Sequence, residues 1–238
     1  MIAGTDLAYS NRKINYPAMK ADGIQFAFIR IGQGLEISDN LYIIHKAGCK
    51  SIGIPWGPYF FADYSYPPVV QSTRFSLLVG EDIGELPWMF DFEYEERLGW
   101  GRPSGYAMYK WGCSFLENLE QKAPKGKKLE TYTNPDLIHA MKPWLKPGDP
   151  FLRNGLFLAH WTTEQYIDFE PWSKWDFWQQ AGDVHGDWSE GDVDYDYFNG
   201  TEAELCALCT FPPSCVPAND HELLIRLVGE AKAHGWKV

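Results

Sequence analysis

Short apolar runs recur along the first 200 residues and alternate with polar or helix-like stretches. Eight runs have the length and the content of β-branched and aromatic residues that are typical of strands. They cover residues 2–6, 25–31, 52–61, 87–93, 128–133, 156–160, 175–179 and 191–194. The pattern therefore predicts a chain built around eight strands.

Helical periodicity lies mainly between the strands of the first half. The clearest case follows Ser104, which can cap a helix with Met108, Trp111 and Phe115 on one apolar face. Between the last strands the helices are short or missing, and segments such as residues 142–153 are rich in proline and glycine. The two halves of the chain should therefore differ in their helical cover.

Repeated units of strand and helix predict a parallel sheet, and eight of them predict its closure into a barrel. We expect an α/β fold, an irregular single-domain TIM-like β/α barrel with short or missing helices in the second half. Residues 1–200 would form this catalytic barrel. Residues 201–238 break the pattern with a cysteine-rich loop and an amphipathic helix, and we expect them to form a tail packed on the barrel.

Composition narrows the range of partners. The chain has a formal net charge of −11, which removes the electrostatic attraction to nucleic acid and to anionic membranes. No apolar run approaches the roughly 18 residues that a membrane span needs. Aromatic residues make up 16% of the chain, and together with the many carboxylates they favour a neutral polyhydroxylated ligand such as a glycan.

The cysteines and histidines give little support for a metal site. The odd number of cysteines, five, argues against a disulfide framework. Cys206, Cys209, Cys215 and His221 approach the spacing of zinc ligands, but they share a segment with apolar spacing, which favours reduced structural thiols. No zinc-protease, phosphate-loop or nucleophile-elbow motif occurs. The sequence predicts neither a metal nor a cofactor.

Four acidic residues stand at or near the ends of apolar runs: Asp6, Asp91, Glu93 and Asp194. Catalytic residues of such barrels lie at the carboxyl ends of the strands, so we expect these acids to meet at one mouth. Asp91 and Glu93 are two apart on a strand, which puts both on one face, about 6.5 Å apart at their bases. Two carboxylates this close cannot both ionise cheaply, so one keeps its proton near neutral pH. Cleavage of a glycosidic bond requires this division of labour.

Several short motifs follow one another in an order known from one family of enzymes. They are Gly4-Thr5-Asp6, Arg30-Ile31-Gly32, Gly57-Pro58-Tyr59, Asp91-Phe92-Glu93, Tyr132-Thr133-Asn134, Ala159-His160-Trp161, and Trp175 to Gln179 followed by Asp194. Over roughly residues 2–200 the chain resembles the glycoside hydrolase family 25 lysozymes, the Chalaropsis-type muramidases. It departs from them at Ala8 and Tyr9, where a serine-containing stretch is common, and at Asp196, where asparagine is frequent.

The resemblance implies a retaining peptidoglycan hydrolase that cleaves the β-1,4 bond between N-acetylmuramic acid and N-acetylglucosamine, assisted by the substrate's own N-acetyl group. It implies that Glu93 is the general acid and that Asp91 orients and polarises this acetamide, with direct nucleophilic attack by Asp91 as the alternative. Asp6 and Asp194 would flank the pair. Three aromatic residues would line the substrate groove: Tyr59, Tyr132 and Trp161.

Two other functions fit the same residues: a non-catalytic barrel that binds cell-wall glycan, and a glycosidase that acts on another polymer such as chitin. The presence of all four acids argues against a pure binder, which needs no protonated Glu93. The chain opens without the basic and apolar segments of a signal peptide. This fits a phage endolysin made in a host cytoplasm, and the alternative is a secreted chain whose leader has been removed. In both settings we expect a monomer that acts on the bacterial cell wall.

Overall fold

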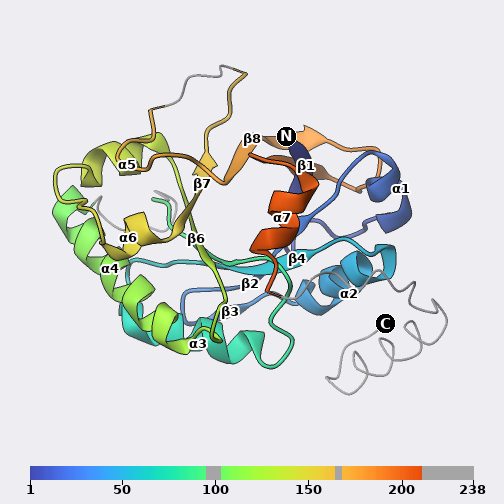
Figure 1. Ribbon diagram of the computed structural model, residues 1–238. Coiled ribbons are helices and arrows are strands. Elements are labelled where there is room, and N and C mark those ends of the chain that lie inside the picture. Colours follow the sequence, from blue (N-terminus) through green and yellow to red (C-terminus); the bar gives the residue numbers. More distant parts are fainter. Residues whose placement is uncertain (95–102, 164–167, 211–238) are drawn as a thin grey trace.

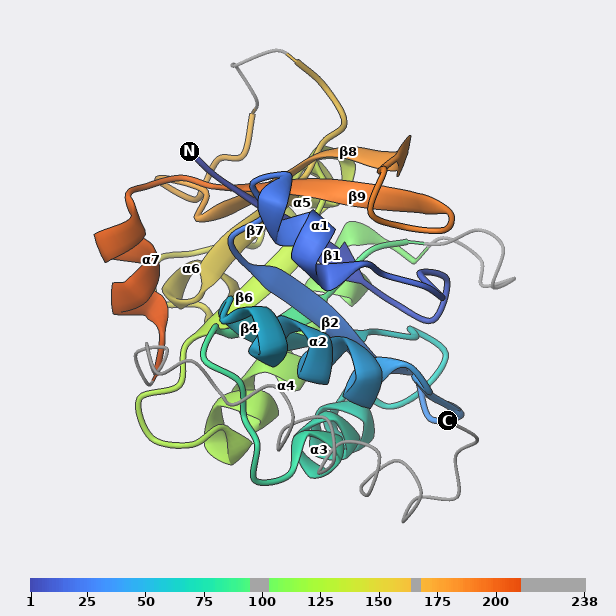
Figure 2. The same ribbon diagram turned by 90° about the vertical axis from the view of Figure 1, so that its right-hand side faces the viewer.

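The structure is a computed structural model that describes residues 1–94, 103–163 and 168–210. At its centre the described strands form a closed eight-stranded barrel (Figures 1 and 2). In their order around the ring, these strands are β1 (Ile2–Leu7), β2 (Ala27–Gln33), β4 (Trp56–Phe61), β5 (Trp88–Asp91), β6 (Leu129–Thr133), β7 (Gly155–Ala159), β8 (Phe177–His185) and β9 (Asp192–Phe198). The short strand β3 (Ile37–Ser38) pairs with β2 outside the ring.

All eight runs that predicted strands form strands, and the prediction of an α/β barrel is confirmed. The direction of the last strand differs from the expected parallel arrangement. From β1 through β2, β4, β5, β6 and β7 to β8, each strand is parallel to the next around the ring. Strand β9 runs antiparallel to both of its neighbours, β8 and β1. The reason is chain length, because only residues 186–191 separate β8 from β9 and a parallel crossover needs about a dozen residues or more.

The helices cover the first half of the barrel more fully than the second, as the sequence predicted. Those described before β9 are α1 (Tyr16–Ala21), α2 (Tyr42–Ile52), α3 (Pro68–Val79), α4 (Gly105–Lys122), α5 (Pro135–Met141) and α6 (Pro150–Arg153). Ser104 caps α4 as expected, because its side chain accepts a hydrogen bond from the Ala107 N–H. The apolar face of α4 buries Met108, Trp111 and Phe115.

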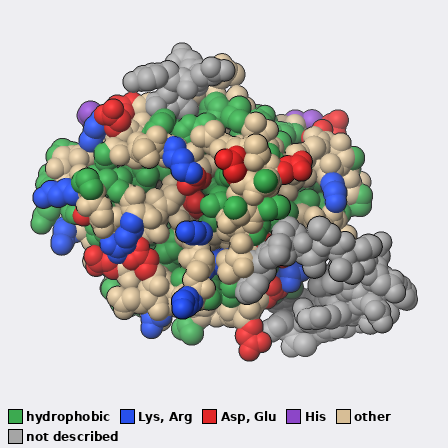
Figure 3. Space-filling view, in the orientation of Figure 1, with side chains coloured by type: hydrophobic (Ala, Val, Ile, Leu, Met, Phe, Trp, Pro, Cys, Tyr) green, Lys and Arg blue, Asp and Glu red, His purple; other side chains and the backbone are tan. Residues whose placement is uncertain are grey.

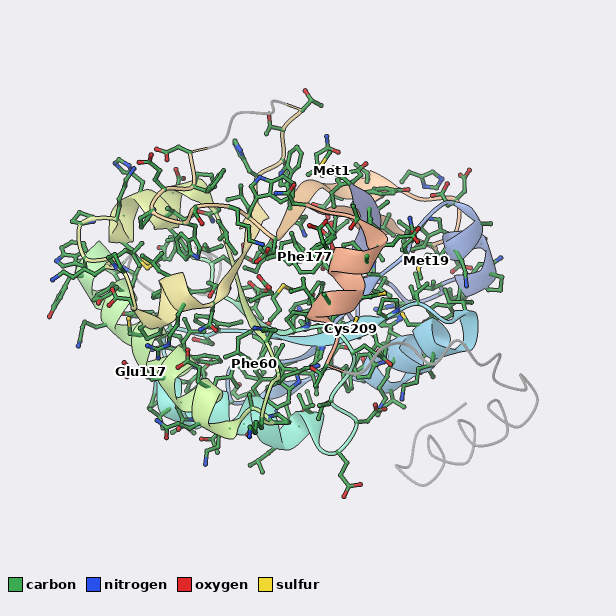
Figure 4. The ribbon with its side chains drawn as sticks, in the orientation of Figure 1. Met1, Met19, Phe60, Glu117, Phe177 and Cys209 are labelled. Carbon is green, nitrogen blue, oxygen red and sulfur yellow. The ribbon has the colours of Figure 1, made fainter. Side chains whose placement is uncertain are left out.

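Aromatic rings fill the core on both sides of the sheet. Inside the barrel, the ring centroid of the fully buried Phe177 lies 5.2 Å from that of Phe26 and 5.1 Å from that of Phe28 (Figure 4). Between the sheet and the helices, Phe90 stacks on Phe115 of α4 with centroids 4.2 Å apart. The high aromatic content, in which we saw a hint of glycan binding, therefore serves largely to pack this core.

The described part of the C-terminal tail is a short helix, α7 (Glu202–Leu208). Thr201 and Glu204 form a capping box at its start, in which the Thr201 hydroxyl accepts from the Glu204 N–H and the Glu204 carboxylate accepts from the Thr201 N–H. Leu205 is buried and belongs to the same apolar cluster as Phe177 and Phe198. This first helix of the tail thus contributes to the packing of the barrel.

Most of the predicted tail, residues 211–238, lies outside the described residues, and so do Cys215 and His221 of the candidate zinc cluster. The other two members, Cys206 and Cys209, are free thiols, Cys206 exposed and Cys209 half-buried. The assignment of residues 201–238 to one packed tail stays a prediction. In the part of the chain that the structure describes, no helix is both long and apolar enough to cross a membrane.

Removing the aromatic ring of Phe177 from inside the barrel should destabilise the whole fold. We expect Phe177→Ala to lower the free energy of unfolding by about 3–5 kcal/mol, because a buried ring leaves a cavity that its aromatic neighbours cannot fill. Urea denaturation followed by tryptophan fluorescence measures this loss. The control is Leu77→Ala on α3, whose side chain is 76% exposed and whose removal should cost less than about 0.5 kcal/mol. Equal losses in the two variants would contradict the central role of Phe177.

Candidate active site

A cleft of about 980 Å³ opens at the end of the barrel where the parallel strands have their carboxyl ends. The structure brings all seven sequence-predicted site residues to this cleft: Asp6, Asp91, Glu93, Asp194, Tyr59, Tyr132 and Trp161. A second cavity of about 430 Å³ shares Glu93, Tyr132 and Trp161 with it and extends to Asn134 and Asp136 at the start of α5. The two cavities therefore form one elongated depression, which we call the groove.

The acids reach the groove from three strands. Asp6 belongs to β1, and Asp91 is the last residue of β5, with Glu93 two positions further along the chain. Asp194 lies near the beginning of β9, not at the end of a parallel strand as the sequence argument assumed. It still reaches the mouth because β9 runs in the opposite direction, which places its first residues where the other strands end.

Gln179 of β8 joins three of the predicted residues into one network. Its Nε2 donates a hydrogen bond to Asp6 Oδ2 at 2.7 Å, while its Oε1 accepts from the Tyr132 hydroxyl and from Trp161 Nε1, both at 2.8 Å. Its side chain is buried. Sequence reasoning assigned Gln179 no role, and the available signal was its place at the end of the Trp175–Gln179 motif.

The three predicted aromatic residues meet the groove in different ways. Tyr59 and Tyr132 are buried in the barrel interior, and the Tyr59 hydroxyl donates to Asp6 Oδ1 at 3.4 Å. Trp161 is 59% exposed. Its ring rests on Gly182, where a Cβ atom would come within 2.3 Å of it. Trp161 thus offers a ring to a ligand, whereas the two tyrosine rings pack in the core and turn their hydroxyl groups toward the acids.

Asp6 and Asp194 form a carboxyl pair in which a proton is shared. Burial raises the pKa of Asp6 to about 6, against the lowering effect of the hydrogen bonds from Gln179 and Tyr59. Burial and then the charge of Asp6 raise the pKa of Asp194 to about 8, and the two carboxyl groups are hydrogen bonded to each other. The backbone N–H of Asp183, in a β-bulge of β8, donates to Asp194 Oδ1 at 3.1 Å. At neutral pH Asp194 therefore keeps its proton and donates a hydrogen bond to the Asp6 carboxylate.

A third carboxyl group lies deeper in the barrel, on the same face of β9. Asp196 is fully buried, in register with Gly4 of β1 and Gln179 of β8, and neither of its carboxyl oxygens has a hydrogen-bond partner among the described residues. Burial and the charges of Asp6 and Asp194 raise its pKa well above the usual value. Burial therefore favours the protonated, uncharged form of Asp196. The sequence singled it out as a departure from the family pattern but not as a member of the acidic cluster.

One basic side chain faces these acids among the described residues that line the cleft. Arg30 of β2 is buried, and its Nε donates to Asp39 Oδ2 at 3.0 Å. Its charge lowers the pKa of Asp6, in opposition to burial. No group of three or more His, Cys, Asp or Glu side chains in the described ranges could hold a metal ion. The groove thus offers protonated and ionised carboxyl groups to a ligand, together with one exposed ring, a set suited to acid–base chemistry on an uncharged polar molecule.

The opposite end of the barrel has a different character. A cavity of about 790 Å³ lies at the amino ends of β6, β7 and β8 and includes none of the predicted site residues. Its lining includes Lys127, Lys128 and Lys174, and both basic and acidic side chains lie on this face, which carries α6 and α7 (Figure 3). The buried Glu130 carboxyl also lines it, packed against Gly155, where a Cβ atom would come within 2.1 Å of a carboxylate oxygen. Residues at this end of a β/α barrel usually serve stability.

The comparison with known protein families gives a single family. Residues 5–186 match the family described as Glycosyl hydrolases family 25. Of the four predicted acids, Asp6, Asp91 and Glu93 fall within the matched range, and Asp194 lies beyond it.

Individual relatives agree with this match. Lysozyme M1 of Streptomyces globisporus is 24% identical over 216 residues, which cover 87% of this chain and 71% of that protein. The bacterial lysozyme of Streptomyces coelicolor has the same fold, with a TM-score of 0.74 and 23% identity over 87% of this chain and 96% of its own. The family GH25 lysozyme of Aspergillus fumigatus follows with a TM-score of 0.70 and 24% identity over 88% of this chain and 99% of its own.

The raised pKa of Asp194 should make the stability of the protein depend on pH. Its folded pKa of about 8 exceeds the ordinary value of 3.8, so unfolding releases its proton, and the wild type should lose stability as the pH rises from about 4 to about 8. We expect Asp194→Asn to flatten this decline, because the amide cannot ionise. Melting temperatures measured across this pH range test the expectation. Asp192→Asn, at an exposed position of the same strand, is the control, and an Asp194→Asn protein with the wild-type slope would refute the assignment.

Proposed function

The chain belongs to the glycosyl hydrolases of family 25, and on this premise we propose that it is a lysozyme that cleaves the β-1,4 bond between N-acetylmuramic acid and N-acetylglucosamine in peptidoglycan. The observation that carries the proposal is the convergence of Asp6, Asp91, Glu93 and Asp194 in one groove. The lysozymes among the relatives support the choice of substrate. The proposed site of action is the bacterial cell wall.

The shape and the charge of the groove suit a glycan strand. The groove is elongated, so several sugar units can lie along it. Trp161 offers an exposed ring, which can cover the apolar face of a sugar, and the carboxyl groups around it can bind hydroxyl and amide groups. The negative charge of the groove would repel a nucleic acid strand but not an uncharged sugar.

Glu93 is the proposed general acid. Its side chain is half-buried and lines both cavities of the groove, so it can reach the oxygen that links two sugars. In the first step Glu93 gives its proton to this leaving oxygen, while the carbonyl oxygen of the substrate's acetamide attacks the anomeric carbon and the glycosidic bond breaks. In the second step the Glu93 carboxylate takes a proton from water, and the water oxygen attacks the anomeric carbon from the face that the leaving oxygen occupied, which breaks the bond to the acetamide oxygen. Two inversions retain the configuration.

Asp91 is the proposed partner of the acetamide. It is buried beside Glu93 at the end of β5, where it is held more rigidly than a residue on a free loop. An ionised Asp91 can accept the acetamide N–H, which aims the carbonyl oxygen at the anomeric carbon and stabilises the positive charge that develops on the amide.

Asp6 and Asp194 form the opposite wall of the site in this proposal. Because Asp194 keeps its proton at neutral pH, the pair carries less negative charge than two ionised acids would. This limits the repulsion of the negative charge on Asp91. The hydrogen bond from Gln179 keeps the Asp6 carboxylate facing the groove, where it can bind a sugar hydroxyl.

The proposed reaction predicts products that differ from those of the alternatives. Purified cell wall is incubated with the wild type and with Glu93→Gln, and new reducing ends are identified by mass spectrometry. We expect muramic acid at the reducing ends with the wild type, and at least about 10²–10⁴-fold slower turnover with Glu93→Gln, because the amide has the shape but not the proton. Binding of the wall should persist in the variant. Wall binding without products would favour a glycan-binding barrel, and products from chitin alone would favour another glycosidase.

The role of Asp91 has its own signature in the pH dependence. Asp91→Asn should cripple turnover, because the neutral amide cannot stabilise the positive acetamide. It should also move the alkaline limb of the pH–rate profile to lower pH, since the general acid loses a negative neighbour that helped to retain its proton. The profile of kcat/KM against pH on a soluble glycan measures both effects. A near-normal rate with an unmoved profile would show that Asp91 is a structural acid at the end of a strand.

A further inference from the structure

Tyr9, in the loop after β1, is an exposed aromatic residue in the groove that the proposed mechanism does not use. Its side chain is 52% exposed and lines the cleft, although a large apolar ring in water is unfavourable. The guanidinium carbon of Arg30 lies 4.4 Å from the centre of the ring. One face of Tyr9 is therefore covered by Arg30, and the rest of the ring is available to a ligand in the groove.

Both members of this stacked pair are fixed by one buried carboxylate. Asp39 Oδ2 accepts from Arg30 Nε at 3.0 Å and from the backbone N–H of Tyr9 at 2.9 Å. Its Oδ1 accepts from the Leu41 N–H at 3.0 Å, at the start of α2. Asp39 thus sets the position of the ring and of its support at the same time.

The loop that carries Tyr9 is tied down at further points. The Ala8 N–H donates to Asn11 Oδ1 at 2.8 Å, and Asn11 Nδ2 donates to the Asp192 carbonyl at 3.0 Å. Ala8 O lies 3.2 Å from Nε2 of the buried His45. Because a carbonyl can only accept, this His45 nitrogen carries the proton and its Nδ1 accepts from the Tyr16 hydroxyl at 2.9 Å. Such a loop presents Tyr9 with little conformational entropy left to lose on binding.

Tyr9 and Trp161 reach the mouth from different parts of the strand ring. Arg30, under the Tyr9 ring, belongs to β2, and Trp161 follows β7. In the closed ring of eight, β2 and β7 are four steps apart, and the Trp161 ring leans over Gly182 of β8, which is three steps from β2 by way of β9 and β1. Glu93 follows β5, which lies on one of the two arcs between β2 and β7. Tyr9 lines the larger cavity of the groove but not the smaller one, which Trp161 and Glu93 both reach, so a chain that contacts both rings lies along the mouth that Glu93 lines.

From these observations we propose that Tyr9, supported by Arg30, is a second sugar-binding platform, and that it holds a ring of the glycan on the far side of the scissile bond from Trp161. The ligand is an N-acetylhexosamine unit of the glycan, whose apolar face packs on the tyrosine ring. This inference rests on the proposed function of the groove. It makes Tyr9 a binding residue, and Arg30 and Asp39 positioning residues.

The platform predicts a dependence of affinity on glycan length. The test uses the Glu93→Gln protein, which leaves its ligand intact, and peptide-free glycan oligomers of one to four disaccharide units, with dissociation constants from titration calorimetry. Addition of Tyr9→Ala should weaken binding of the longest oligomer about tenfold and leave the shortest unchanged, because one disaccharide can bind at Trp161 alone, whereas a longer chain also reaches Tyr9. Tyr9→Trp, which keeps an aromatic face, should restore the affinity for the long oligomer.

Two further variants complete the test. Tyr106→Ala on α4 removes a ring that is 50% exposed and does not line the groove, and it should bind every oligomer like the parent. Arg30→Gln should reproduce the length-dependent loss of Tyr9→Ala, because the ring loses its support. Equal affinities of Tyr9→Ala and its parent for all lengths, or an equal loss at every length, would overturn the proposal.

The same titrations separate this inference from the substrate assignment. If the parent Glu93→Gln protein binds chitin oligomers but no peptidoglycan glycan, the proposed substrate is disproved. The length dependence is then measured with chitin oligomers, and Tyr9→Ala should again weaken the binding of the long oligomers alone. A parent that binds neither polymer at any length would overturn the platform as well.

Discussion

The barrel is closed by β9, and the site depends on the direction in which this strand runs. As the one strand of the ring that is antiparallel to its neighbours, β9 enters at the mouth and leaves at the floor. Asp194, near the start of the strand, therefore meets Asp6, and Asp196, two residues further along, lies beneath them. A parallel β9 would have placed Asp194 toward the floor, away from the groove. The short connection after β8 thus determines the composition of the acidic cluster as well as the topology.

The protein gains this cluster at a cost in stability. Asp6 and Asp196 are buried and Asp194 is half-buried in an interior filled by phenylalanine and tyrosine rings, where ionised groups are poorly solvated. Two features make the arrangement tolerable. Retained protons reduce the charge, and hydrogen bonds from Gln179, Tyr59 and the Asp183 N–H stabilise what charge remains. The same low polarity strengthens each electrostatic interaction with a substrate, so the features that weaken the fold at high pH are those that suit it to proton transfer.

Few aromatic side chains are exposed in the groove, and hydrogen bonds hold those few in place. Gln179 holds Trp161 on one side through a side-chain hydrogen bond, and Asp39 holds Tyr9 on the other through its backbone and through Arg30. Most other aromatic side chains are in the core, where they keep the strands that carry the acids in place. The fold thus separates two uses of the aromatic ring, since buried rings hold the strands that carry the acids, and the exposed rings of Tyr9 and Trp161 stay available to a ligand.

The sequence by itself determined the elements that depend on neighbouring residues. Strand positions follow from apolar runs, the start of α4 follows from Ser104, and Asp91 and Glu93 occur together in one short motif at a strand end. Only the tertiary structure decided the features that depend on residues far apart in the sequence. Asp6 and Gln179 are 173 positions apart, and nothing local to either residue indicates their hydrogen bond. Nor does periodicity distinguish a buried Tyr59 from an exposed Trp161, or reveal that β9 is reversed, because burial and strand direction are set by the packing of the whole ring. The tertiary structure also decides the pKa values of Asp6 and Asp194, since desolvation and charge pairing arise only when the closed barrel brings these side chains together.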